Sequence, residues 1–302
     1  MLVRWWWTKC LKSLCLILLL YFINISGHGL RRIKKKTITN STIRQYVHTY
    51  NILKKYLPTI TVDKINRNIY QKFIDDYGQN HAKETVIKIN ALVHSAVKDA
   101  VYDGIMEKDF IPRTSLVYDP NKTWKIDYLN VSEMKQLVEY LKNTRTKNYT
   151  SKYMILLAIY TGMRLGEVQG LKWSDINFNF KTITISRSWN AIEHKYQEPK
   201  TESSKRTIRV NQEILKIISE LKVNGYQETF MNQFKTLPTS GAVNKVLRNS
   251  LKELGINKHR FHFHSLRHTH VAYLLSNDVD IYVISKRLAI LTSQLLLTSI
   301  HI

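Results

Sequence analysis

The chain has 302 residues, enough for one large or two modest domains, and its 44% hydrophobic content indicates a folded globular protein. Its 46 Lys and Arg against 23 Asp and Glu give a formal net charge of +23, which favours a polyanionic partner, either nucleic acid or an anionic membrane surface. Only Cys10 and Cys15 occur, which excludes a disulfide framework or a cysteine zinc site in the remaining chain and indicates a reduced, intracellular protein.

The first 37 residues form an atypical N-terminal segment. Its basic start and its apolar run from Leu14 to Ile25 are signal-like, but the run is too short for a comfortable membrane span. No clear cleavage site follows, and nothing downstream is typical of a secreted protein. We favour an artefact of the reading frame over a signal or an anchor, and we expect a cytoplasmic, DNA-associated protein, with membrane or secretion as the minor alternative.

A small helical domain is predicted at residues 38–109. Apolar side chains recur there at helical spacing, with Lys and Arg on the exposed faces. The first helix begins at a Ser/Thr N-cap after Asn40 and stops at Pro58, and later helices stop at Gly78 and Gly104.

Residues 110–129 contain Pro112 and Pro120, break the periodicity and are predicted to be a linker. A second domain is predicted at residues 130–302. It opens with a capped helix in NVSEMKQLVEYLKN and an apolar helix in SKYMILLAIYTG, then alternates as strands in INFNFKTITISRSW and KRTIRV before returning to helices. The expected fold class is therefore mainly α with a small antiparallel β-sheet.

Two stretches of the second domain carry cations that suit a phosphate. In TGMRLGEVQGLKWSDI, Gly162 breaks one helix and Arg164 stands at the start of the next, beside free backbone N–H groups. In EPKTESSKRTIRV, Lys200 and Lys205 lie in the polar connection between strands, which on its own is an ordinary hairpin tip.

A third stretch, HRFHFHSLRHTHVAYLL, places His264 and Arg267 on one helical face if a helix begins near Ser265. Its four histidines suggest a metal, but without cysteine or a carboxylate triad we expect neither a metal site nor a cofactor. His268 and His270 are assigned to packing or capping.

Taken together, four residues follow one another in the order Arg…Lys…His-x-x-Arg: Arg164, Lys200, His264 and Arg267. This series resembles the tyrosine recombinase, or phage integrase, family over about residues 38 to 288. The three stretches resemble the family's first arginine box, its lysine hairpin and its HxxR box. The resemblance implies a helical core-binding, DNA-binding domain followed by a catalytic domain.

The resemblance also implies a mechanism in which a tyrosine hydroxyl attacks a DNA phosphodiester and forms a 3′-phosphotyrosyl link without a metal. Arg164 and Arg267 would hold the non-bridging oxygens, and His264 would donate to the same phosphate or assist proton transfer. Lys200 would protonate the leaving 5′-oxygen as general acid, with Lys205 as the rival for that role. Glu167, one turn beyond Arg164, would support the arginine without contacting the phosphate itself. The alternative interpretation of Glu167 is an ordinary surface carboxylate.

The pattern of the family fails after Leu288. Ala289 and Ile290 stand where the family has Gly and His, and no tyrosine follows Tyr282, so we expect a catalytic domain truncated near residue 288 without a nucleophile. If Ala289 is encoded by GCC, restoring a single G before that codon shifts the reading frame so that Ala289 and Ile290 are read as Gly and His. Ile300 can supply a Tyr codon in the same way. A frameshift is therefore our explanation of the tail.

These observations predict site-specific DNA recombination or integration by a phosphotyrosine mechanism, defective in this chain. The alternative is a catalytically inactive DNA-binding protein that occupies recombination sites. The expected partners are double-stranded DNA at attachment sites and other recombinase protomers, with accessory DNA-bending factors as a further expectation and a membrane not expected.

Overall fold

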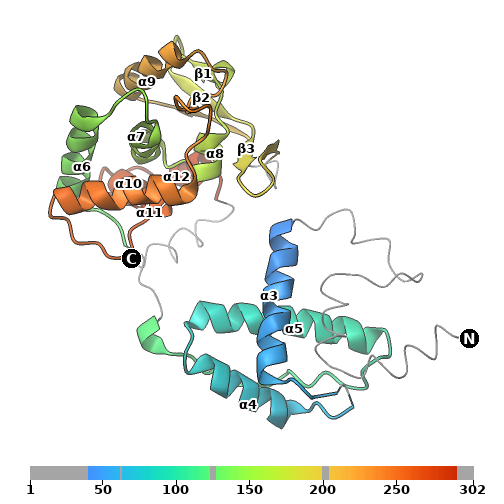
Figure 1. Ribbon diagram of the computed structural model, residues 1–302. Coiled ribbons are helices and arrows are strands. Elements are labelled where there is room, and N and C mark those ends of the chain that lie inside the picture. Colours follow the sequence, from blue (N-terminus) through green and yellow to red (C-terminus); the bar gives the residue numbers. More distant parts are fainter. Residues whose placement is uncertain (1–39, 62, 123–126, 199–203, 291–302) are drawn as a thin grey trace, which may run out of the picture. The chain divides into compact units, whose positions relative to one another are not determined.

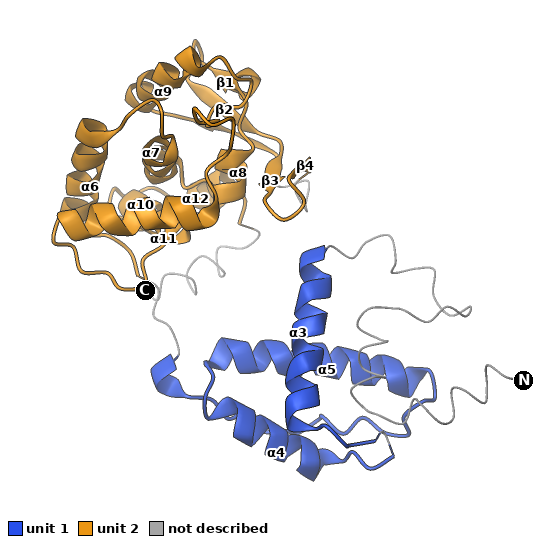
Figure 2. Ribbon diagram, viewed as in Figure 1, with its two compact units in different colours: residues 1–125 blue, residues 126–302 orange. Residues whose placement is uncertain are grey.

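The structure is a computed structural model that describes residues 40–61, 63–122, 127–198 and 204–290. Two compact units divide the chain between Lys125 and Ile126 (Figure 2). Three predictions fall outside the described residues: the atypical segment 1–37, Lys200 in the hairpin, and the tail from residue 291 onward.

In its described residues the first unit contains three α-helices, coloured blue to cyan in Figure 1: α3 (Asn40–Tyr56), α4 (Arg67–Gly78) and α5 (Lys83–Tyr102). Helix α4 begins where the Asn66 side chain accepts a hydrogen bond from the Ile69 amide, which satisfies one otherwise unpaired N–H. Its buried aromatic residues are Tyr70, Phe73 and Tyr77: Phe73 stacks on Tyr77 and meets Tyr70 at a tilt, and all three pack in one core with the apolar face of α5. The first unit therefore has a hydrophobic core of its own.

The end of α4 explains why a glycine stands there. A Cβ on Gly78 would lie 1.9 Å from the carbonyl oxygen of Val117, so no larger residue fits beneath that strand of backbone. Phe110 and Ile111, within the segment predicted as a linker, are buried in the core of the first unit.

The second unit is also mainly helical. Its α-helices are α6 (Val131–Thr144), α7 (Ser151–Thr161), α8 (Leu165–Gln169), α9 (Gln212–Ser219), α10 (Ser240–Glu253), α11 (Phe263–Leu275) and α12 (Ile281–Leu288). Helix α7 is apolar on all sides and almost wholly buried, as expected for a helix enclosed by others. Figure 1 shows it in the middle of the unit, where it contacts α6, α8, α9, α10 and α11.

Two small antiparallel sheets lie beside these helices. The larger has the order β1 (Ile176–Asn177), β2 (Thr182–Ile185), β5 (Arg206–Arg209), and β3 (Ser188–Asn190) pairs with β4 (Lys195–Gln197) in a separate hairpin. The predicted fold class, mainly α with a small antiparallel sheet, is confirmed. The polar connection between the two predicted strands holds the second hairpin, which alternation alone did not indicate. Within the described ranges, every helix is either too short or too polar to cross a lipid bilayer.

Candidate active site

Arg164 stands at the junction between α7 and α8. Gly162 ends α7 with a left-handed backbone, φ 66°, and a Cβ there would lie 2.7 Å from Leu288 Cδ2 and 2.9 Å from His270 Cδ2. Glycine is therefore needed for the backbone conformation and for the packing. Arg164 follows in extended conformation as the N-cap of α8, with its side chain 43% exposed. This turn places the Arg164 guanidinium at the surface, directly after an almost wholly buried helix.

Glu167 lies behind Arg164 and is almost completely buried. Its carboxylate accepts hydrogen bonds from the Arg164 amide at 2.9 Å and from Arg164 Nη1 at 3.0 Å. It also accepts two parallel bonds from Arg206, at 3.1 and 2.9 Å, and the side chains of this pair are only 7–8% exposed. Burial alone would raise the pKa of Glu167, but the bonds and charge of Arg206 and Arg164 outweigh it and lower that pKa. Glu167 is therefore a buried, ionised carboxylate that joins two arginines.

Arg206 was missed from the sequence, although β5 carried a signal for it. In RTIR, Arg206 and the buried Ile208 are two residues apart and so face the same side of the strand. A charged residue on the inward face requires a partner, because an unpaired buried charge is costly. Arg206 also donates to the backbone carbonyls of Ser204 at 3.2 Å and Arg287 at 2.7 Å.

Arg267 is 5% exposed and held by two backbone carbonyls. Its Nη1 donates to Gly162 at 2.9 Å and its Nη2 donates to Leu288 at 2.5 Å, so the end of α7 and the end of α12 fix the guanidinium between them. Burial, followed by the nearby charge of Arg164, lowers the pKa of Arg267 to about 9. The two predicted arginines therefore lie close enough to act on each other electrostatically.

His264 lies on the first turn of α11, which begins at Phe263, slightly before the predicted start near Ser265. Desolvation, followed by the neighbouring His268 and Arg267, lowers the pKa of His264 to about 4. Its ring meets the ring of His268 edge-on, with centroids 5.1 Å apart. At neutral pH His264 is thus an uncharged imidazole beside the arginine pair.

The electrostatic balance of this group favours an anion. The charges of Arg164 and Arg206 both lower the pKa of Arg267, while Glu167 supplies the opposing negative charge. Three guanidinium groups and one carboxylate within electrostatic reach of one another leave an excess of two positive charges. Arginine pairs and a neutral histidine donor at such a place suit the non-bridging oxygens of a phosphate.

The structure thus brings together four of the predicted residues: Arg164, Glu167, His264 and Arg267. Lys205 is exposed immediately before β5, next to Arg206, whereas Lys200 lies outside the described residues. His270, predicted to pack or cap, is buried: its Nδ1 contacts the Ile159 carbonyl at 2.9 Å and its Nε2 accepts from Arg287 Nε at 3.3 Å.

The C-terminal end of α12 adjoins this group. Ala289 caps the helix in the left-handed conformation, φ 52°, and the Ile290 amide bonds back to the Ser285 carbonyl at 3.0 Å. Tyr282 lies on the first turn of the same helix and is 63% exposed, with the Lys286 ammonium 5.3 Å from its ring. Tyr282 and Leu288 are six positions apart, which is about 9 Å along a helix axis.

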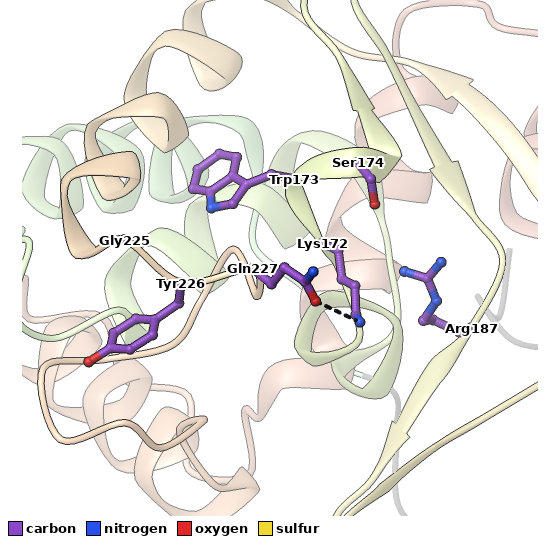
Figure 3. Close-up of a pocket in the computed structure, with 7 residues that line it drawn as sticks. All are labelled: Lys172, Trp173, Ser174, Arg187, Gly225, Tyr226 and Gln227. Atoms are coloured by element: carbon purple, nitrogen blue, oxygen red, sulfur yellow. Dashed lines mark hydrogen bonds between the residues drawn. The ribbon is translucent and has the colours of Figure 1, made fainter.

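A separate cavity of about 500 Å³ occurs elsewhere in the second unit (Figure 3), lined by Lys172, Trp173, Ser174, Arg187, Gly225, Tyr226 and Gln227. Its cations already have partners. Lys172 Nζ lies 3.4 Å from Gln227 Oε1 and 4.8 Å from the centre of the Tyr196 ring, and Arg187 pairs with Asp175 at 2.6 Å. In the part of the chain that the structure describes, no group of three or more His, Cys, Asp or Glu could hold a metal ion.

Comparison with known proteins shows which sequences this chain is similar to. A sequence model described as the phage integrase family matches residues 127–290, and one described as the phage integrase SAM-like domain matches residues 22–118. An integrase of Staphylococcus phage L54a is 26% identical over 268 residues, which is 78% of this chain and 75% of that protein.

Solved structures share the fold at low sequence identity. The integrase of transposon Tn1549, in complex with a circular intermediate DNA, gives a TM-score of 0.77 at 17% identity and covers 94% of both chains. A lambda integrase dimer bound to a COC′ core site gives a TM-score of 0.71 at 15% identity, over 99% of this chain and 80% of the other.

Proposed function

Because this chain belongs to the phage integrase family of tyrosine recombinases, whose work is site-specific DNA recombination and integration, we propose that it binds duplex DNA at attachment sites. Arg164, His264 and Arg267 hold one backbone phosphate of that duplex. The observation that carries the proposal is that Arg267 lies within electrostatic reach of both Arg164 and His264, while Glu167 bonds to Arg164 and leaves an excess of positive charge.

Each of the three residues has a role that its surroundings support. Arg267 is fixed by the carbonyls of Gly162 and Leu288 and keeps further N–H groups that can donate to a phosphate oxygen. Arg164, oriented from behind by Glu167, is more exposed and meets the phosphate from the surface side. The exposed His264 donates to a phosphate oxygen or moves a proton, because desolvation by its neighbours and nearby cationic groups lower its pKa to about 4.

Lys200 is the proposed general acid for the leaving 5′-oxygen, with Lys205 as the alternative in the same connection. The order of the motifs supports a lysine in this connection and is met by both, because Lys200 and Lys205 each lie between Arg164 and His264. Lys205 precedes Arg206, whose bonds to Glu167 and Ser204 bring the end of the hairpin to the candidate site.

We further propose that this 302-residue chain does not cleave DNA. In the family pattern the nucleophilic tyrosine follows the Leu-Gly-His box, and here Ala289 and Ile290 replace the last two residues and no tyrosine follows Tyr282. Tyr282 does not substitute for it, since its ring is exposed on the first turn of α12 and Arg267 bonds to the last turn. The chain then occupies recombination sites as a binding protein.

The partners follow from the relatives. Integrases with this fold have been solved with DNA and, for lambda integrase, as a dimer on a core site. We infer that this chain likewise binds duplex DNA alongside other protomers of its kind, with accessory DNA-bending proteins assisting.

A duplex selected by the full chain from a random-sequence pool tests the proposal. We expect a gel shift that Arg164→Ala and Arg267→Ala each weaken about 10-fold, the loss expected when one charge-assisted contact to phosphate is removed. We expect no adduct that survives denaturing electrophoresis, since loss of one essential catalytic member removes most of the rate. A covalent adduct would show that another residue serves as nucleophile, and binding unaffected by either arginine variant would exclude the proposed site.

A further inference from the structure

Arg206 connects three segments that are far apart in the sequence. Its guanidinium bonds to both oxygens of Glu167 on α8, to the carbonyl of Ser204 at the end of the lysine hairpin, and to the carbonyl of Arg287 on the last turn of α12. These four contacts, with distances between 2.7 and 3.2 Å, use its donors on all three nitrogens.

Only an arginine has the chemistry for this arrangement. The planar fork matches a carboxylate through two parallel bonds, and its Nε–H remains for a third acceptor in the same plane. A lysine in its place would carry the charge as a single point and could not satisfy all the acceptors at once. Because Arg206 is only 7% exposed, water does not replace the lost bonds.

The same carboxylate holds Arg164. Glu167 accepts from the amide and from Nη1 of Arg164, so its position decides where that guanidinium points. Without Arg206, the buried charge of Glu167 would keep one partner, Arg164, and would draw it inward. The orientation of Arg164 towards a ligand therefore depends on Arg206, which stands on another strand.

We propose that Arg206 is a positioning residue: acting through Glu167, it directs Arg164 to the phosphate. The proposal rests on the function proposed above. It assigns no contact between Arg206 and the DNA.

A double-mutant cycle on DNA affinity tests this assignment, with the full chain and the duplex that it selects from a random-sequence pool. The variants are Arg206→Lys, Arg164→Ala and the two combined, and thermal unfolding of each checks that it folds. Arg209→Lys, an exposed position on the same strand β5, is the matched control and should bind as the unmodified chain does.

We expect Arg206→Lys to weaken binding about 5-fold in the unmodified chain but less than about 2-fold in the Arg164→Ala background, because residues that act as a unit are not additive. Equal losses in both backgrounds would overturn the positioning role, since a general loss of structure acts whether or not Arg164 is present. An Arg206→Lys variant that binds normally would overturn it as well.

If Arg206→Lys fails to fold, Glu167→Asp replaces it in the same cycle. The shorter carboxylate keeps the charge but moves the point that joins the two arginines, so the same non-additive loss is expected. Additivity there would equally overturn the role. If Arg164→Ala alone leaves binding unchanged, the phosphate-binding function itself fails, and the positioning role fails with it.

Discussion

Ala289 is held in a backbone conformation that favours glycine. It lies in the left-handed region, with φ 52° and ψ 54°, directly after α12. The amides of Ala289 and Ile290 both bond back to carbonyls of the last turn, which is the arrangement that usually ends a helix with glycine. The side chain of Ile290 packs against the small apolar cluster of Val271, Ile284 and Leu288. The cap thus has its ordinary geometry with an unfavourable residue in it.

Replacing Ala289 with glycine should stabilise the second unit by about 0.5–1 kcal/mol, because the left-handed conformation costs an alanine about 1 kcal/mol or more. Urea unfolding should show a higher midpoint and an unchanged m-value. In the control, Ala272→Gly inside α11, the same change should destabilise by about 1 kcal/mol, since glycine weakens a helix interior. Equal shifts of the same sign in both variants would contradict the prediction.

At the scale of single residues, the sequence indicated the residues proposed to contact the phosphate better than the residues that hold them in position. Arg164, His264 and Arg267 could be selected because their types, order and spacing resemble the motifs of the family, and the structure brings them within electrostatic reach of one another. Arg206 could not be selected in this way. Its significance depends on Glu167, 39 positions away along the chain, and that contact becomes visible only when β5 and α8 are placed side by side.

The negative charge of Glu167, which its lowered pKa maintains at neutral pH, gives a second test at this scale. Glu167→Gln keeps the shape of the side chain but leaves Arg206 buried without its negative partner, so we expect a loss of about 3 kcal/mol. The difference from the unmodified chain should be present at pH 7. It should shrink as pH falls below about 4.5, where the unfolded carboxyl becomes protonated, because the native carboxyl has a lowered pKa and its stabilisation is lost in that window. Urea midpoints at several pH values measure both effects, and a difference that does not change with pH would contradict the assigned ion pair.

At the scale of elements, α12 is held by its C-terminal end. Arg206 and Arg267 donate to the carbonyls of Arg287 and Leu288, the unpaired acceptors of the last turn, where cations also favour the helix dipole. Arg287 in turn donates to His270 Nε2, while His270 Nδ1 bonds to the Ile159 carbonyl of α7. The C-terminal ends of α7 and α12 are therefore joined to α11 by hydrogen bonds as well as by the packing of Leu288.

His270 should make this connection sensitive to acid. Burial, followed by the positive charge of Arg287, lowers the pKa of His270 to about 3, so the folded ring stays neutral while an unfolded one titrates near 6.5. The unfolded state therefore binds the extra proton, and stability is fully present above pH 6.5 and lost progressively between 6.5 and 3. His270→Asn keeps a donor near Ile159. It should reduce the slope of the unfolding free energy against pH by an amount that corresponds to at most about one bound proton.

Urea midpoints between pH 7 and 4 measure that slope. His259, exposed beyond α10, supplies the control, and His259→Asn should leave the slope as it is. An undiminished slope in the His270 variant would show that other groups, such as His264 and His268 with their own lowered pKa values, account for the acid sensitivity.

At the scale of the whole molecule, composition and periodicity were sufficient for the fold class. Helix positions followed from apolar spacing and from stops such as Gly78 and Gly162, because those signals lie within one turn of the element they end. The second hairpin, β3–β4, was not predicted, since its strands of three residues are too short to show alternation. Contacts with residues distant in the sequence stabilise such short strands, and a local sequence pattern does not reveal those contacts.

The net charge of +23 predicts that DNA affinity falls steeply with salt. One stripe of that charge lies on α10, whose Asn244 side chain accepts a hydrogen bond from the Phe263 amide at the start of α11, next to His264. Three exposed cations follow on α10 at helical spacing: Lys245, Arg248 and Lys252. If they face the phosphates that flank the candidate site, replacing all three with glutamine should reduce the slope of log affinity against log salt by about 2.7, or about 0.9 for each contact.

Titration of the selected duplex between about 50 and 200 mM salt measures the slope, because counterion release is linear on these axes. The matched control removes the same charge from other surfaces of the second unit, through three exposed lysines replaced by glutamine: Lys181, Lys216 and Lys235. A net-charge effect alone would lower both slopes equally, since both variants lose three charges. A larger loss for the α10 variant would place that helix against the duplex, whereas equal losses would leave the +23 charge as a diffuse attraction without a preferred face.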